Sequence, residues 1–174
     1  MTHLLKKHAI KPEDVQSVDI VTTHEPSCMA PNLRWPKSGL QGKFSTWYTV
    51  ASLIVDGGRL DLSSFTDEAA RRPAVQALLH KVNITQDPET AGRPHRSLGG
   101  AHWWDVTVTL KNGERLVCPR VEANGGRGDS YNWESREAVF DKFRMLAGHV
   151  LKPSQVDSAI DAIMSMETAA DVRS

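Results

Sequence analysis

The sequence has little of several features that mark common protein classes. Its 174 residues include only two cysteines and 6% aromatic residues, and 21 basic side chains balance 21 acidic ones. A balanced charge without a basic stripe argues against nucleic acid as a partner. No run of 18 apolar residues and no signal-like start occurs, so we expect a soluble, cytoplasmic chain without a membrane partner.

Motifs for metal binding and for nucleophilic catalysis are also lacking. None of the seven histidines pairs with another at a four-residue spacing, and none has a cysteine partner, so neither a metal site nor a cofactor is predicted. No Gly-x-Ser-x-Gly elbow occurs. Cys28 and Cys118 are isolated, which favours reduced, structural thiols in the cytosol and leaves a disulfide open.

The clearest positive pattern runs from Gly39 to Gly58. Apolar residues recur there at the spacing of one helix face, at Phe44, Trp47, Tyr48, Ala51, Ile54 and Val55. Gly57 and Gly58 stand where a helix commonly ends. The sequence therefore predicts a buried helix. Lys43, Ser45 and Tyr48 would bring an ammonium and two hydroxyls to its amide-rich first turn, which would suit an anion.

The remaining segments predict an α+β fold. Four alternating stretches read as strands, and Asn112-Gly113 between the last two predicts a hairpin. Thr66 and Pro73 each mark the start of a short helix, and amphipathic helices follow at 133–151 and after 153. We expect one domain over 1–174, in which a four-stranded, mostly antiparallel sheet is packed by helices on one face and 153–174 form a terminal helix and tail. The strands are predicted at 15–23, 81–86, 103–110 and 114–121.

Three loops separate these elements, at 25–38, 87–100 and 123–132. The last contains a glycine-rich run and an Arg127-Gly128-Asp129 triplet, which we interpret as chance resemblances to a phosphate loop and an integrin ligand. Trp103 and Trp104 either pack on the sheet or form a ligand shelf.

Several ordered motifs resemble one family. The run G-L-Q-G-K-F-S-T-W-Y-T-V-A-S-L-I-V-D-G-G is similar to G-L-x-A-K-F-S-x-x-Y-x-x-A-x-x-L-x-D-G of the MmgE/PrpD family, whose members are lyases and isomerases of small carboxylates, among them 2-methylcitrate dehydratase. The later run F-T-D-E-A-A-R-R-P-A-V-Q-A-L-L-H-K-V and the hairpin V-T-V-T-L-K-N-G resemble further family motifs, so that the likeness spans roughly residues 10 to 170. Three features depart from the family pattern. Gly42 stands where the family usually has alanine, Arg72 stands where it often has a carboxylate, and the loop from Thr90 to His102 matches no family motif.

The resemblance covers only the carboxy-terminal domain of a longer enzyme. It implies a substrate-capping and dimerising domain, without a metal, for a small di- or tricarboxylate. Tyr48 would be the catalytic residue, and Lys43 and Ser45 would bind substrate. The terminal helices would pack on a helical domain that this chain lacks, so we expect it to be inactive alone, with an apolar patch covered by a homo-oligomer or by a separate helical-domain chain.

The residues alone leave other interpretations open. Tyr48 would also serve as a core residue whose hydroxyl finds a partner, and Lys43 as a solvated surface charge. Besides the enzyme domain, the chain could be a non-catalytic module that binds polycarboxylates, or a structural interaction module.

Overall fold

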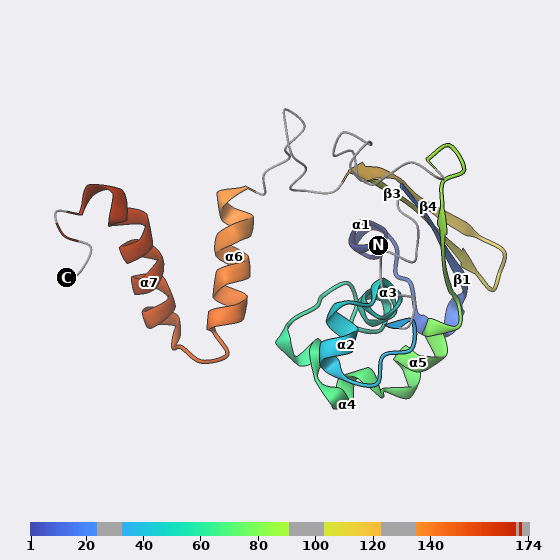
Figure 1. Cartoon of the computed structure of the whole chain (residues 1–174), viewed down its shortest axis with the longest axis horizontal. Coiled ribbons are helices and arrows are strands. Elements are labelled where there is room, and N and C mark those ends of the chain that lie inside the picture. Colours follow the sequence, from blue (N-terminus) through green and yellow to red (C-terminus); the bar gives the residue numbers. More distant parts are fainter. Residues whose placement is uncertain (24–32, 91–102, 123–134, 170, 172–174) are drawn as a thin grey trace. The chain divides into compact units, whose positions relative to one another are not determined.

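The computed structural model describes residues 1–23, 33–90, 103–122, 135–169 and 171. The chain divides into two compact units, Met1–Asn132 and Trp133–Ser174, which we describe separately (Figure 1). The predicted loops at 25–38 and 87–100 lie partly outside the described residues, and that at 123–132 entirely so, as do Cys28 and the Arg127-Gly128-Asp129 triplet. The assignment of 1–174 to a single domain remains a prediction.

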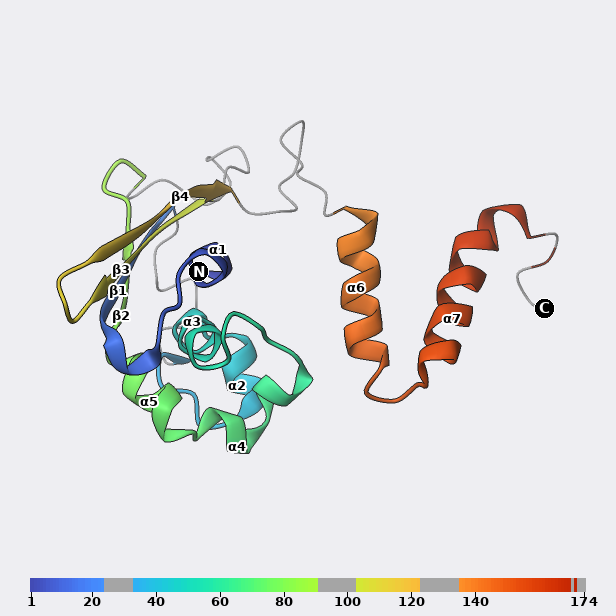
Figure 2. The same cartoon turned by 180° about the vertical axis from the view of Figure 1, so that it is seen from behind.

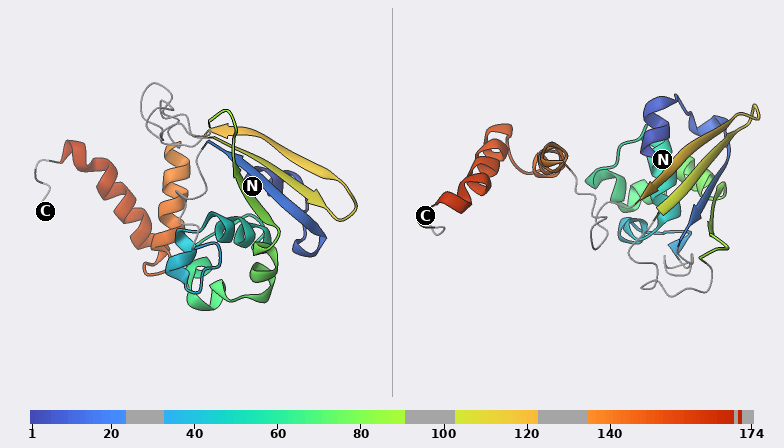
Figure 3. Two further views of the ribbon diagram at one scale, coloured as in Figure 1. Left: turned by 45° about the vertical axis from the view of Figure 1, so that its right-hand side comes forward. Right: turned by 90° about the horizontal axis from the view of Figure 1, so that it is seen from above.

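The first unit contains a four-stranded sheet with the order β2-β1-β3-β4 (Figure 3). Its strands are β1 (Val15–Thr22), β2 (Val82–Gln86), β3 (Trp103–Leu110) and β4 (Arg115–Glu122). β1 lies antiparallel to β3 and parallel to β2, and β3 lies antiparallel to β4. Two of the three pairings are antiparallel, so the mixed sheet confirms the predicted α+β fold.

Alternation along the strands produces one buried face. The register aligns two rows of side chains across all four strands, one through Val18 and one through Ile20. These residues are 0% and 3% exposed, whereas their neighbours on the opposite face are more exposed. The rows are Val82-Val18-Val108-Leu116 and Ile84-Ile20-Val106-Cys118.

The predicted hairpin between β3 and β4 is confirmed. Gly113 has φ of +87°, a backbone conformation that glycine adopts without a steric penalty. The amide of Gly113 donates a hydrogen bond to the carbonyl of Leu110 at 2.9 Å. The amide of Leu110 donates one to the carbonyl of Glu114 at 2.8 Å. Local turn chemistry thus fixes this pairing.

Helices cover one face of the sheet (Figures 1 and 2). Helix α1 (Thr2–Lys7) contacts β4, and α3 (Thr46–Val55) contacts both β2 and α5 (Pro73–Leu79). A short 3₁₀ turn, η1 (Pro12–Asp14), leads into β1. The core forms where the apolar faces of α1, α3 and α5 meet the buried rows of the sheet.

The central stretch differs from the prediction in one respect. It forms two helices, α2 (Gly39–Lys43) and α3, which are separated by Phe44 and Ser45. Phe44 is 66% exposed, so its placement on the buried stripe was wrong. The break occurs because Ser45 leaves the helical conformation and caps α3 with its hydroxyl. The predicted stop is confirmed, since Gly57 and Gly58 both have positive φ.

A compact segment connects α3 with α5. It holds the 3₁₀ helix η4 (Leu62–Phe65) and the helix α4 (Asp67–Ala70). The predicted N-cap is confirmed, because the Thr66 hydroxyl accepts a hydrogen bond from the amide of Ala69 at 3.1 Å. Pro73 begins α5 at the position where its missing amide costs nothing, which confirms the second start.

The second unit is a helical hairpin of α6 (Arg136–Ala147) and α7 (Pro153–Ser165), which the 3₁₀ turn η6 (Met166–Thr168) follows. Val156 and Ile160 of α7 are buried, and Arg144 of α6 lies 3.5 Å from the carboxylate of Asp157. Several apolar side chains are nevertheless exposed: Val139, Val150, Ile163, Met164 and Met166. Among the described residues no helix is both long and apolar enough to span a bilayer.

Replacement of Gly39 by alanine tests the approach of α2 to the segment after α3. A Cβ at Gly39 would collide with the backbone carbonyl of Phe65, so Gly39→Ala must separate the two segments. We expect a loss of about 3 kcal/mol in the free energy of unfolding, measured by urea denaturation. The matched control is Leu40→Ala, because Leu40 is 68% exposed on the same helix and should change stability by less than about 0.5 kcal/mol. Equal midpoints for the two variants would contradict this packing.

Candidate functional site

Tyr48 lies in the first turn of α3, and its side chain is 0% exposed. Its hydroxyl donates a hydrogen bond to the backbone carbonyl of Ser64 at 2.5 Å. Phe65 lies beside the ring, with centroids 6.1 Å apart. Tyr48 therefore joins α3 to η4, and in this arrangement its hydroxyl is engaged with the protein itself.

The glycine at position 42 makes room for the ring of Tyr48. A Cβ built on Gly42 would lie 2.8 Å from two ring carbons, closer than such atoms pack. Gly42 is one of the departures from the family pattern. Its missing side chain leaves the space that the ring of Tyr48 occupies in this chain.

Ser45 acts as the cap of α3. Its hydroxyl accepts from the amide of Tyr48 at 3.1 Å, and its carbonyl accepts from the hydroxyl of Thr49 at 2.9 Å. The side chain is 1% exposed. One amide of the predicted anion site is thus occupied by Ser45.

Lys43, the last residue of α2, is exposed and has no ion pair with any residue that the structure describes. The structure therefore brings Ser45 and Tyr48 into direct contact and leaves Lys43 in solvent two residues from Ser45. The predicted roles of the three residues in catalysis and substrate binding remain predictions.

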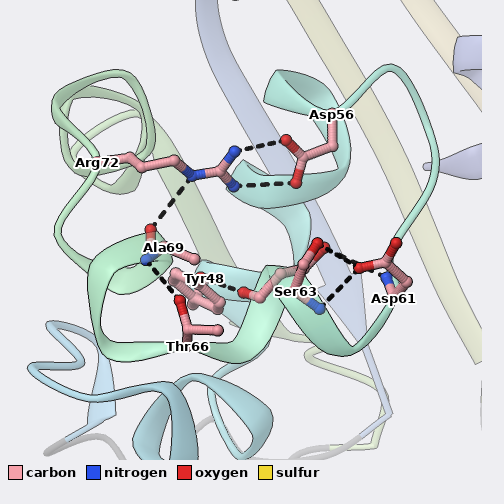
Figure 4. A network of polar contacts seen from close by, with 8 residues as sticks. Tyr48, Asp56, Asp61, Ser63, Thr66, Ala69 and Arg72 are labelled. Atoms are coloured by element: carbon pink, nitrogen blue, oxygen red, sulfur yellow. Dashed lines mark hydrogen bonds and ion pairs between the residues drawn. The ribbon is translucent and has the colours of Figure 1, made fainter. Parts of the chain in front are cut away.

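A polar network surrounds the hydroxyl of Tyr48 (Figure 4). Asp61 accepts hydrogen bonds from the amide and hydroxyl of Ser63, at 2.8 and 2.5 Å. Arg72 forms two hydrogen bonds with the carboxylate of Asp56, at 2.6 and 2.9 Å, and its Nε donates to the carbonyl of Ala69 at 3.3 Å. Every member of this network lies between Tyr48 and Arg72 in the sequence.

The charge of Arg72 is stabilised by its partner. The hydrogen bonds that Arg72 donates to the carboxylate of Asp56 raise the pKa of Arg72 above its usual value. Partial burial opposes this rise, and the negative charge of Asp56 adds to it. Tyr48 adds smaller contributions that also raise the pKa of Arg72. Sequence reasoning missed the pair, because Asp56 and Arg72 are sixteen residues apart and no short motif links them.

Two cavities lie elsewhere in the first unit. One, of about 350 Å³, is lined by residues of α1, α3 and the sheet, including His3, Thr46, Trp104 and Cys118. Trp104 thus borders a cavity, whereas Trp103 is 9% exposed. The second, of about 520 Å³, is lined by Trp35, Pro36, Lys37, Arg71 and Gln76. Neither cavity is lined by Tyr48.

Potential metal ligands do not gather in the described part of the chain, where no three histidine, cysteine, aspartate or glutamate side chains come together. Cys118 of β4 is a buried free thiol. The functional groups described around Tyr48 are serine and threonine hydroxyls, the carboxylates of Asp56 and Asp61, and the guanidinium of Arg72.

Comparison with known proteins identifies the class to which this α+β fold belongs. Residues 1–168 match the model of the MmgE/PrpD C-terminal domain. The chain belongs to the MmgE/PrpD family, as its central motif indicated.

Among its relatives are two cis-aconitate decarboxylases. The human protein is 26% identical over 174 residues, which cover 97% of this chain and 33% of that protein. The mouse protein is 23% identical over 176 residues, which cover 96% of this chain and 33% of that protein. The chain thus spans about a third of the length of these relatives.

Replacement of Tyr48 by phenylalanine tests the buried hydrogen bond. Tyr48→Phe keeps the ring and leaves the Ser64 carbonyl without its donor, so we expect a loss of about 1–2 kcal/mol in the free energy of unfolding by urea denaturation. Ser63→Ala is the control, because its hydroxyl is exposed and should contribute less than about 0.5 kcal/mol. A Tyr48→Phe protein as stable as the parent would contradict the hydrogen bond.

Proposed function

We propose that this chain forms the carboxy-terminal, substrate-capping part of a lyase or isomerase that acts on small di- or tricarboxylates. The observation that carries the proposal is the family match over residues 1–168 together with coverage of one third of two cis-aconitate decarboxylases. We further propose that the chain is inactive alone, because a site that lacks most of its walls cannot position a substrate.

Tyr48 is proposed as the catalytic residue. Reactions of this class remove a proton or carbon dioxide next to a carboxylate, or expel a hydroxyl group, and each needs a positioned proton donor or acceptor. A phenol can donate its proton to the carbon that retains the electron pair after carbon dioxide leaves. In this role the Tyr48 hydroxyl would exchange the Ser64 carbonyl for the substrate.

Ser45 and Lys43 are proposed to bind substrate carboxylates. The Ser45 hydroxyl accepts from the Tyr48 amide and keeps its own proton for a carboxylate oxygen. Lys43 is exposed and can supply a charge-assisted hydrogen bond to a second carboxylate. Polycarboxylate substrates suit such a pair, because they present two or more anionic groups.

The proposed partner is a helical domain, on a separate chain or in the same enzyme. Val150 and Ile163 of the helical hairpin are 84% and 54% exposed, and burial of such side chains favours association. A homo-oligomer, for example a dimer, that covers the same residues is the alternative. We propose a cytoplasmic location, as for a metabolic enzyme.

A second candidate function is a module that binds polycarboxylates or another protein without catalysis. The burial of Tyr48 and the hydrogen bond of its hydroxyl to Ser64 favour this non-catalytic function. These contacts give Tyr48 a structural role that requires no catalytic one.

Turnover in an assembled enzyme separates these functions. The chain is measured alone and together with the helical portion of a family enzyme, on tri- and dicarboxylates. We expect turnover only in the assembly, a loss of about 10²-fold in kcat for Tyr48→Phe, and a raised KM for Lys43→Ala. Lys37→Ala removes another exposed lysine of the same region and should leave both constants unchanged.

Failure of the enzyme proposal has distinct signatures in this experiment. A thermal midpoint of the chain that rises with citrate but without turnover in any assembly would identify a binding module. An unmoved midpoint and no turnover would identify a structural domain.

A further inference from the structure

The segment 61–70, here called the covering segment, lies over the hydroxyl of Tyr48. It comprises η4 and α4, and the Ser64 carbonyl that accepts from Tyr48 belongs to it. If Tyr48 acts on a substrate, this segment fixes where its hydroxyl points and has to yield when a substrate arrives.

The covering segment is braced internally by its own caps. The amide of Asp61 donates to the Ser64 hydroxyl at 3.2 Å, while the Asp61 carboxylate accepts from the amide of Ser63. The Thr66 hydroxyl caps α4. Because these hydrogen bonds lie within the segment, we expect the segment to move as a rigid unit rather than to unfold locally.

Three further polar contacts tie the covering segment to the helices around it. In one of them the Ala70 carbonyl accepts from Nε2 of Gln76 in α5 at 2.6 Å. The carboxylate of Asp67 accepts from the amide of Gly39 at 2.9 Å, which ties it to α2. At its far end the Ala69 carbonyl accepts from Nε of Arg72, whose two terminal nitrogens hold the carboxylate of Asp56 (Figure 4). Asp56 is the C-cap of α3, the helix that carries Tyr48.

We propose that Arg72 is a positioning residue that, through its ion pair with Asp56, holds the covering segment over the hydroxyl of Tyr48. The inference rests on the proposed role of Tyr48 where it concerns catalysis. The pair joins the end of the helix that carries Tyr48 to the end of the segment that carries its acceptor, so the two ends separate only when the pair breaks.

The geometry of the pair suits this role. A two-pronged arginine-carboxylate contact is directional, and partial burial, with 34% and 23% of the two side chains exposed, reduces its screening by solvent. The neighbouring Arg71 offers a contrast. It approaches Asp67 through one nitrogen at 3.7 Å, with both side chains more than half exposed.

The accessibility of Tyr48 provides a direct test. The sequence has two tyrosines, so Tyr131→Phe leaves Tyr48 as the one phenol that tetranitromethane can nitrate. In this background Arg72→Met should raise the rate of nitration, followed by peptide mass spectrometry, by roughly tenfold. Arg71→Met, the matched control, should change it by less than about twofold.

Charge reversal and urea dependence identify the cause. Asp56→Arg combined with Arg72→Asp restores an ion pair and should return nitration toward the parent rate, whereas each single change should not. Nitration through local opening depends weakly on sub-denaturing urea, whereas nitration through global unfolding rises steeply. An unchanged rate in Arg72→Met, or an increase that follows global unfolding alone, would overturn the proposal.

In the assembled enzyme the same variants test positioning. Arg72→Met should lower kcat more than it changes KM, and Arg72→Lys should restore part of the loss. Faster nitration without any change in kcat would overturn the positioning role. Nitration as expected in an assembly whose parent form has no turnover would instead contradict the proposed enzyme function and leave the covering segment in place.

Discussion

The hydrogen bond from Tyr48 to the Ser64 carbonyl is the contact on which the helix layer of the first unit depends. The ring fills the space that Gly42 leaves open, and the hydroxyl satisfies a carbonyl of the segment that returns toward α5. Because both groups are buried, neither can be lost without cost. Tyr48 therefore takes part in the packing of the helices, holds the covering segment through Ser64, and is the candidate catalytic residue.

This arrangement explains how one domain could both protect and present a catalytic phenol. Membership of the MmgE/PrpD family links the chain to enzymes such as the cis-aconitate decarboxylases, of which it spans about a third. The Tyr48 hydroxyl is hydrogen-bonded to Ser64 in the isolated chain. It would become available for catalysis if another domain brought a substrate that competes for this hydroxyl. The Asp56-Arg72 pair would then set how readily Tyr48 is released.

The strands, the hairpin and the helix caps were predictable because their signals are local, as with Asn112-Gly113 or Thr66 before an acidic turn. The parallel pairing of β1 with β2 was not, since it depends on how the intervening helices cross the sheet. Phe44 was misplaced because periodicity continues through a helix break, although Ser45 is a recognisable cap. Nor does any motif encode the acceptor for Tyr48, a backbone carbonyl sixteen residues away.

The most direct test of the account is a crystal structure of the chain assembled with a helical domain and soaked with a tricarboxylate. The account predicts that the Tyr48 hydroxyl leaves the Ser64 carbonyl and lies within hydrogen-bond distance of the ligand, with Ser45 and Lys43 near its carboxylates. A ligand bound elsewhere, with the contact between Tyr48 and Ser64 intact, would contradict it and identify Tyr48 as a structural residue.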